Sequence, residues 1–125
     1  MRRIGVRDVD IVLQDMFDAD PAKVGLFDSI TFSEVLEHME KPGDALRSLH
    51  NVLSDDGFLF LHMPVNSPAP DHIFLLPSPE AVVEFAESHG FKVVDKFFAP
   101  QTGMTLESAR ERKKTISVAL VAKKA

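Results

Sequence analysis

Residues 26–39 read Leu26-Phe-Asp-Ser-Ile-Thr-Phe-Ser-Glu-Val-Leu-Glu-His-Met39, and the expected fold of the chain follows from this stretch. Its first part, residues 27–32, is apolar and β-prone, which predicts a buried strand. That strand runs directly into two carboxylates and an imidazole, Glu34, Glu37 and His38. Ligands of open α/β folds bind beside the carboxyl ends of the strands. The stretch therefore predicts an α/β sheet with a candidate binding site at this edge.

Strand-like and helix-like segments alternate along the rest of the chain. Apolar runs predict four further strands, at residues 8–15, 58–63, 91–98 and 115–122. Helical spacing and capping residues predict two helices, at residues 44–53 and 78–90. The alternation predicts right-handed crossovers and parallel strands, whereas the last two strands predict an antiparallel hairpin near one sheet edge. Residues 58–63 are apolar on both faces, which is typical of a central strand covered by helices on both sides.

Composition restricts the function classes. The chain has 125 residues, which predicts one domain over residues 1–125. It has no cysteine, so a disulfide framework, a thiolate nucleophile and a cysteine metal site are excluded. The net charge of −5 argues against a nucleic-acid surface and against binding to an anionic membrane. No apolar run is long enough to span a bilayer, and we expect a cytoplasmic protein.

Three segments resemble class I S-adenosylmethionine-dependent methyltransferases. Residues 27–38 resemble their F-D-x-V…E-V-L-E-H segment, and residues 53–61 resemble their L-K-P-G-G turn into the next strand. Residues 71–91 are similar to their H-x-x-x-F-S-P-E-x-L…G-F segment, and the closing hairpin matches the reversed last strand of that fold. The resemblance implies a Rossmann-like sheet, S-adenosyl-L-methionine as cofactor, and methyl transfer to oxygen, nitrogen or carbon of a small-molecule acceptor.

The chain departs from that family at its start. The family's glycine-rich cofactor loop is absent, because the six glycines never form G-x-G. The resemblance therefore implies the C-terminal portion of a methyltransferase, N-terminally truncated relative to the family and without two central strands. Strand edges need a partner. We expect the predicted first strand to pair with residues 27–32, or a homodimer or a partner chain to complete the sheet.

The resemblance also assigns residues to the cofactor. It places Asp15 and Met16 beside the adenine, and Ser33 and Glu34 beside the methionine end. Close backbone approach to a cofactor needs glycine. The chain is therefore expected to keep only one side of the cofactor site.

The charged cluster has three alternative interpretations. In one helical turn, Glu34, Glu37 and His38 would share a face at i, i+3 and i+4. With His72 they resemble the Mg²⁺, Mn²⁺ or Zn²⁺ site of metal-assisted O-methyltransferases of small RNAs and ubiquinone precursors. Alternatively, His38 with Glu37 acts as a general base at the acceptor. The helix dipole also explains two acidic residues in a first turn without any ligand.

The sequence also leaves two alternative functions open. The missing loop favours a cofactor-free binding or regulatory partner of a complete methyltransferase, and RNA 2′-O-methylation is a third reading that the net charge opposes. His62, inside a predicted strand, is expected to be a hydrogen-bonded sheet residue and not a catalyst. For three residues near the last loop, Phe97, Phe98 and Met104, the favoured interpretation is core packing and the alternative is the lining of a substrate pocket.

Overall fold

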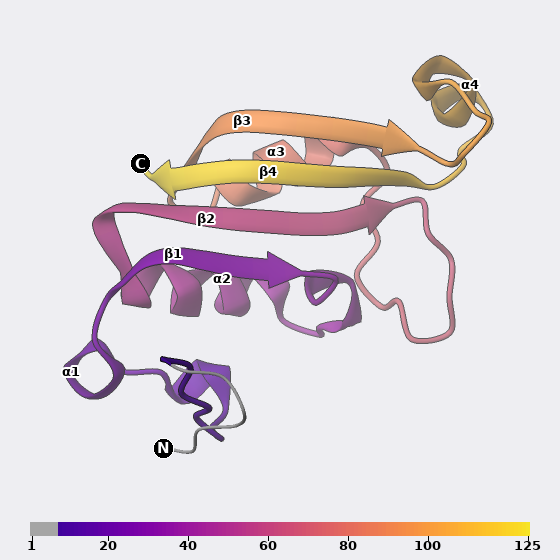
Figure 1. Cartoon of the computed structure of the whole chain (residues 1–125). Coiled ribbons are helices and arrows are strands. Elements are labelled where there is room, and N and C mark those ends of the chain that lie inside the picture. Colours follow the sequence, from indigo (N-terminus) through magenta and orange to yellow (C-terminus); the bar gives the residue numbers. More distant parts are fainter. Residues whose placement is uncertain (1–7) are drawn as a thin grey trace.

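A computed structural model describes residues 8–125, which form a mixed four-stranded sheet. The strand order is β1-β2-β4-β3 (Figure 1). β1 and β2 are parallel, while β4 is antiparallel to both β2 and β3. The parallel pair followed by an antiparallel closing pair confirms the predicted fold class. The strands span β1 Phe27–Ser33, β2 Leu53–Val65, β3 Phe91–Pro100 and β4 Ile116–Lys124.

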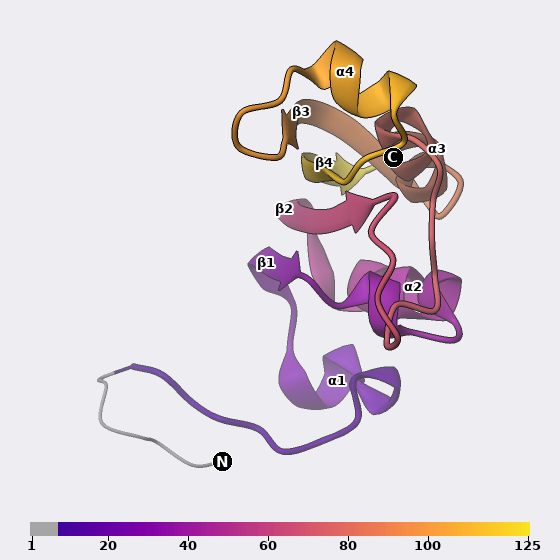
Figure 2. The ribbon, with the colours of Figure 1, turned by 90° about the vertical axis from the view of Figure 1, so that its right-hand side faces the viewer.

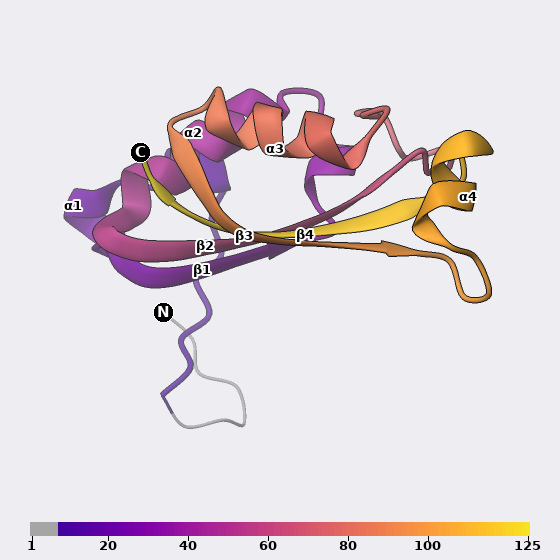
Figure 3. The same cartoon turned by 90° about the horizontal axis from the view of Figure 1, so that it is seen from above.

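Two helices cover one face of this sheet (Figure 3). Helix α2, Pro42–Val52, begins with a proline that suits the first helical position, and Ala45, Leu46 and Leu49 on its inner face are buried. Helix α3, Pro79–Glu87, begins at Ser78, whose side chain accepts a hydrogen bond from the backbone N–H of Ala81. The shorter elements are the 3-10 turns η1 Met16–Asp18 and η2 Leu36–His38, α1 Pro21–Val24 and α4 Leu106–Glu111.

The core lies between these helices and the sheet. Side chains alternate along a strand, so every second residue of β2 and β4 points into the core. On β2 and β4 these are Leu59, Leu61, Met63, Val118, Leu120 and Ala122. The opposite face, defined here as the bare face, carries Phe58, Phe60 and Phe97, which are 39%, 44% and 69% exposed. The prediction that helices cover both sides of residues 58–63 is therefore wrong for the described residues.

The predicted strand at residues 8–15 does not form. Apart from an isolated bridge at Ile11, this segment has no regular structure, and Leu13 is fully exposed. In Figure 2 the segment lies apart from the four strands. A β-prone run becomes a strand only where packing and a neighbouring strand support it. The expected pairing of this segment with β1 as an added strand of the sheet is also wrong, because β1 is an edge strand.

One smaller difference concerns the start of β2. Residues 54–57, predicted as a turn, lie within β2 as an irregularity, because Phe27 pairs with Leu53 and Ser29 with Phe58. The polar segment between β3 and β4 contains the short helix α4. Among the described residues, no helix has the length and apolar character needed to cross a bilayer.

Candidate active site at the carboxyl ends of β1 and β2

The site lies where the parallel strands β1 and β2 reach the same edge of the sheet. Ser33, the last residue of β1, pairs with His62 of β2, and the backbone N–H of Glu34 donates to the carbonyl of His62 at 3.0 Å. η2 then leads away from the sheet. The loop that follows β2 returns over η2, because the carbonyl of Glu37 accepts hydrogen bonds from the N–H groups of Ile73 and Phe74. The predicted site residues after β1 therefore meet the predicted His72 region.

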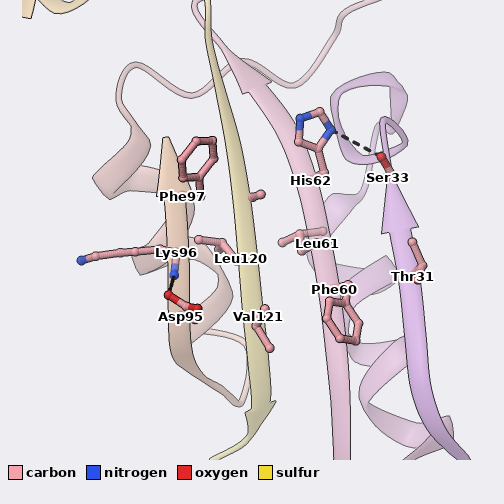
Figure 4. A pocket seen from close by; sticks show the side chains of 11 residues that line it. Thr31, Ser33, Phe60, Leu61, His62, Asp95, Lys96, Phe97, Leu120 and Val121 are labelled. Carbon is pink, nitrogen blue, oxygen red and sulfur yellow. Dashed lines mark hydrogen bonds between the residues drawn. The ribbon is translucent and has the colours of Figure 1, made fainter. Parts of the chain in front are cut away.

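Glu34 does not share a helical face with Glu37 and His38, so that prediction is wrong. Its backbone is left-handed, with φ of 59°, and only Leu36–His38 form a helical turn. The carboxylate of Glu34 instead contacts His62, with 3.1 Å between Glu34 Oε1 and His62 Nδ1. The hydroxyl of Ser33 lies 3.4 Å from the same nitrogen (Figure 4). The end of β1 is thus joined to β2 by side chains as well as by backbone.

Glu37 is the buried acid of the site. It is 0% exposed, and neither of its carboxylate oxygens has a hydrogen-bond partner among the described residues. Burial raises the pKa of the Glu37 carboxyl, and the neighbouring carboxyl of Glu34 raises it further. A buried polar group without a partner is costly to folding. Such a group is a candidate for contact with a cation or with a hydrogen-bond donor of a ligand.

Two imidazoles face Glu37. His38 Nδ1 lies 2.9 Å from the carbonyl of Asp71, and His72 Nδ1 lies 2.6 Å from the carbonyl of Ser67. Because a carbonyl only accepts, both Nδ1 atoms carry the proton, and both Nε2 atoms keep a lone pair. His38 Nε2 is 3.7 Å from Glu37 Oε1, and the two rings meet edge to face at 4.8 Å. One ligand atom from each of Glu37, His38 and His72 lies within 4.8 Å of the others.

Asp15, which was predicted to contact the adenine, lies apart from the cluster after β1. The Asp15 carboxylate accepts a hydrogen bond from the backbone N–H of Phe17 at 2.9 Å, which caps η1, and no strand precedes it. Met16 is partly buried against the core. Over residues 8–125 no hydrogen bond or ion pair joins Asp15 to the cluster after β1. The structure thus brings Glu37, His38 and His72 together and places Ser33 and Glu34 against His62. It does not bring Asp15 or Met16 into contact with either group.

Sequence reasoning missed the bare face beside this site. A shallow cavity of about 230 Å³ lies there, and its lining includes Thr31, Phe60, His62 and Phe97 (Figure 4). The prediction of core packing is wrong for Phe97 and confirmed for Phe98 and Met104, which are partly buried against the core. The only sequence signal for His62 was a histidine within an apolar strand. Its contact with Glu34 depends on the register of β1 and β2, which the sequence does not specify.

Comparison with known proteins agrees with this fold. A family model described as a methyltransferase domain matches residues 4–112. The ubiquinone biosynthesis O-methyltransferase of Glaesserella parasuis serovar 5 is 34% identical over 76 residues, which cover 59% of this chain and 30% of that protein. The chain therefore spans about a third of the length of this curated relative.

Solved structures show the same arrangement of strands and helices. The Burkholderia thailandensis 1,6-didemethyltoxoflavin-N1-methyltransferase, crystallised with bound 1,6-didemethyltoxoflavin and S-adenosylhomocysteine, superposes with a TM-score of 0.64 at 18% identity, covering 91% of this chain and 50% of that one. The cyclase SpnF superposes with a TM-score of 0.63 at 18% identity, covering 89% and 55%. At these identities the likeness concerns the fold alone, and a fold can host different reactions.

The family match extends over most of the chain and includes residues 27–38, which carry the resemblance to the family's strand and E-V-L-E-H segment. The sheet, with its parallel pair and its closing antiparallel strands, has the topology expected from that resemblance. The chain therefore belongs to the methyltransferase-domain family, as a partial Rossmann-like domain of the class I S-adenosylmethionine-dependent type.

Proposed function

We infer that this chain forms the acceptor side of an S-adenosylmethionine-dependent methyltransferase that acts on a small molecule. One observation carries the proposal: no group among residues 8–125 hydrogen-bonds the buried carboxylate of Glu37, which lies opposite two oriented imidazoles at the carboxyl ends of two parallel strands. Methyl transfer displaces a sulfonium, so the protein mainly aligns the two reactants and removes the acceptor proton. In this proposal His38 accepts that proton through Nε2, and Glu37 holds the imidazolium that forms.

This chain supplies residues for only one side of an S-adenosylmethionine site. Ser33 and Glu34 supply a hydroxyl and a carboxylate at the end of β1, where they would hold the methionine end. Asp15 would contact the adenine amino group beside Met16, although one Asp15 oxygen already caps η1. When bound, the cofactor supplies the electrophilic methyl group. The sequence has no G-x-G, so this chain provides no glycine loop for the rest of the cofactor.

A divalent cation is a second candidate for the same site. Histidines that bind metals typically donate their other N–H to a carbonyl or carboxylate, as His38 and His72 do toward Asp71 and Ser67. Glu37 would be the third ligand, and its partnerless oxygens favour this. Glu34 is left out of the set because its carboxylate contacts His62. Mg²⁺, Mn²⁺ or Zn²⁺ held there would lower the pKa of an acceptor hydroxyl.

A second chain would complete the sheet. β1 is an edge strand, and Phe58, Phe60 and Phe97 on the bare face are exposed, which supports a homodimer or a partner chain at this side. In this reading residues 1–125 form one domain. The cofactor-free regulatory partner remains the alternative, and RNA 2′-O-methylation is disfavoured by the charge of −5. A cytoplasmic location stays a prediction.

Calorimetry with S-adenosylhomocysteine separates the enzyme from the regulatory partner. We expect saturable heat with the wild-type chain and weaker binding for Ser33→Ala. Ser29→Ala is the matched control, because Ser29 is an exposed serine of the same strand. Absence of heat at millimolar ligand would mean that this chain alone binds no cofactor, which favours the regulatory partner.

The metal proposal is tested by titration with Mg²⁺, Mn²⁺ and Zn²⁺. We expect His72→Gln to weaken binding by about tenfold or more, whereas His50→Gln, on helix α2 away from the cluster, leaves it unchanged. Equal affinities in the two variants would place any bound ion elsewhere.

Light scattering tests the completed sheet. A particle of twice 13.9 kDa supports the homodimer. A particle of 13.9 kDa excludes the homodimer at that concentration and leaves the partner chain.

A further inference from the structure

His62 differs from the other histidines of the site in the face on which it lies. His38 and His72 turn toward Glu37 beneath the loop after β2, whereas His62 lies on β2 among residues that face the bare side of the sheet. Its neighbours along and across the strands are Phe60, Ser33 and Ala119. The acceptor site inferred above does not use it.

Glu34 fixes the tautomer of His62. The Glu34 carboxylate, 3.1 Å from His62 Nδ1, can only accept when it is ionised, so Nδ1 carries the proton of the neutral ring. The backbone holds both partners in place, because the Glu34 N–H donates to the His62 carbonyl at 3.0 Å. The second nitrogen, Nε2, therefore keeps a lone pair. A carboxylate that orients an imidazole in this way is the arrangement found behind catalytic histidine bases.

The free nitrogen faces a place where a small molecule fits. In Figure 4 the ring nitrogen that does not contact Ser33 turns away from β1, toward the side of β4 and Phe97. The cavity of about 230 Å³ lies on this side, with Phe60, Phe97 and Val121 as apolar lining and Thr31 as a hydroxyl. Its composition suits an apolar body that carries one polar group near His62.

We propose that His62 is a second proton acceptor of the chain, acting on a hydroxyl-bearing, largely apolar acceptor bound on the bare face, with Glu34 as its positioning residue. This rests on the methyltransferase function inferred above. His62 Nε2 takes the proton of the acceptor hydroxyl, and the oxygen forms its bond to the methyl carbon of S-adenosylmethionine. The carbon–sulfur bond would break with its electron pair staying on sulfur, so the products would be neutral S-adenosylhomocysteine and a methyl ether.

The placement agrees with the general geometry of open α/β sheets. His62 pairs with Ser33, so it lies level with the carboxyl end of β1, where ligands reach such sheets. Glu34 also connects the two histidine sites, because its carboxyl contacts His62 and raises the pKa of Glu37.

The first test needs no activity. Long-range ¹⁵N–¹H NMR of the full chain, at a pH where the imidazoles are neutral, reports which ring nitrogen carries the proton. We expect the Nδ1–H form to predominate at His62 and to lose its majority in Glu34→Gly. Glycine suits the left-handed backbone at residue 34, so this variant removes the carboxylate without backbone strain. The ring of His50, on helix α2, is the internal control, and its tautomer should be the same in the wild-type chain and in Glu34→Gly. A majority Nε2–H form at His62 in the wild-type chain would overturn the proposal.

The second test separates the two proton acceptors. Methyl transfer is measured with the chain and any partner that completes it, using a phenol series of graded hydroxyl acidity as acceptors. We expect His62→Gln to lower kcat by about 10²–10⁴-fold with KM little changed, and the loss to shrink for the more acidic phenols. If His38→Gln alone lowers kcat, His62 is not the base although the methyltransferase function stands. If no phenol is methylated while cofactor binds, the acceptor class is wrong.

Discussion

The two faces of the sheet are built from alternate residues of the same strands, yet they differ in what they contact. On β2, Leu59 and Leu61 are buried in the core, while Phe58 and Phe60, which alternate with them along the strand, reach the surface. Helices α2 and α3 cover one face of the sheet only (Figure 3). Both sets are apolar, so hydrophobicity alone does not separate them. The covered face supplies the stability of the domain. The bare face has the same chemistry without a covering layer, which is typical of a surface that binds something.

The two faces also differ in the carboxylate that each carries at the carboxyl ends of β1 and β2. Glu37 is buried with His38 and His72, and its carboxyl lacks a hydrogen-bond partner among the described residues. Glu34 is exposed and paired with His62. The buried acid destabilises the fold unless something binds it, whereas the exposed acid costs little and orients its partner. The two acids of this edge therefore differ in burial and in partner.

The largest expected effect comes from truncating adjacent residues of β2 that point to opposite faces. Leu61→Ala should lower the free energy of unfolding by about 2–5 kcal/mol, because Leu61 is 2% exposed within the core. Phe60→Ala should cost about 1 kcal/mol or less, because Phe60 is 44% exposed. Urea denaturation measures both. A loss at Phe60 as large as that at Leu61 would mean that a second copy covers the bare face in solution.

The covered face could be predicted well from the sequence. The spacing of Ala45, Leu46 and Leu49 marks the inner face of α2, and the serine–proline start of α3 forms the cap that was expected. These signals are local: a helix face or a cap is specified by residues a few positions apart. The closing antiparallel pair was predictable for a similar reason, since the segment between those strands is short and contains no crossover helix of ordinary length.

The bare side of the molecule could not be predicted in the same way. Residues 8–15 have the composition of a strand but form only the isolated bridge at Ile11, because a strand depends on a neighbouring strand that can be distant in sequence. The contact between Glu34 and His62 joins residues whose positions depend on register and on a left-handed residue at the strand end. No local pattern encodes either. Burial of Glu37 likewise results from the loop that folds back over η2.

An intermediate effect is expected from the buried acid. The folded-state pKa of Glu37 lies above its unfolded value, so its contribution to stability is full below the unfolded pKa and is lost as the pH rises through the folded pKa. Glu37→Gln removes the group that ionises, so the free energy of unfolding should no longer fall as the pH rises. Above neutral pH the variant should therefore be more stable than the wild-type chain by about 1 kcal/mol. Glu40→Gln, at an exposed carboxyl two residues beyond the turn, is the matched control.

Urea midpoints measured from acid to alkaline pH test this expectation. If Glu37→Gln instead destabilises the chain at every pH, the carboxylate already has a bound partner. The natural candidate is a cation held with His38 and His72, and added chelator should then abolish the difference between the two proteins.

The smallest expected effect concerns the layer outside the covered face. Arg110 of α4 makes two hydrogen bonds to the carboxylate of Glu80 on α3, at 2.9 and 2.7 Å. This contact lowers the pKa of Glu80, so its stabilisation is present above the unfolded pKa and is lost as the pH falls through the folded pKa. Both side chains are largely exposed, and water and salt screen the pair. Glu80→Gln should therefore destabilise the chain less than Leu61→Ala, at neutral pH only.

A double-mutant cycle with Arg110→Gln, followed by urea denaturation, measures the coupling between the two side chains. A coupling that persists in acid would show that the pair acts through packing of α4 and not through charge.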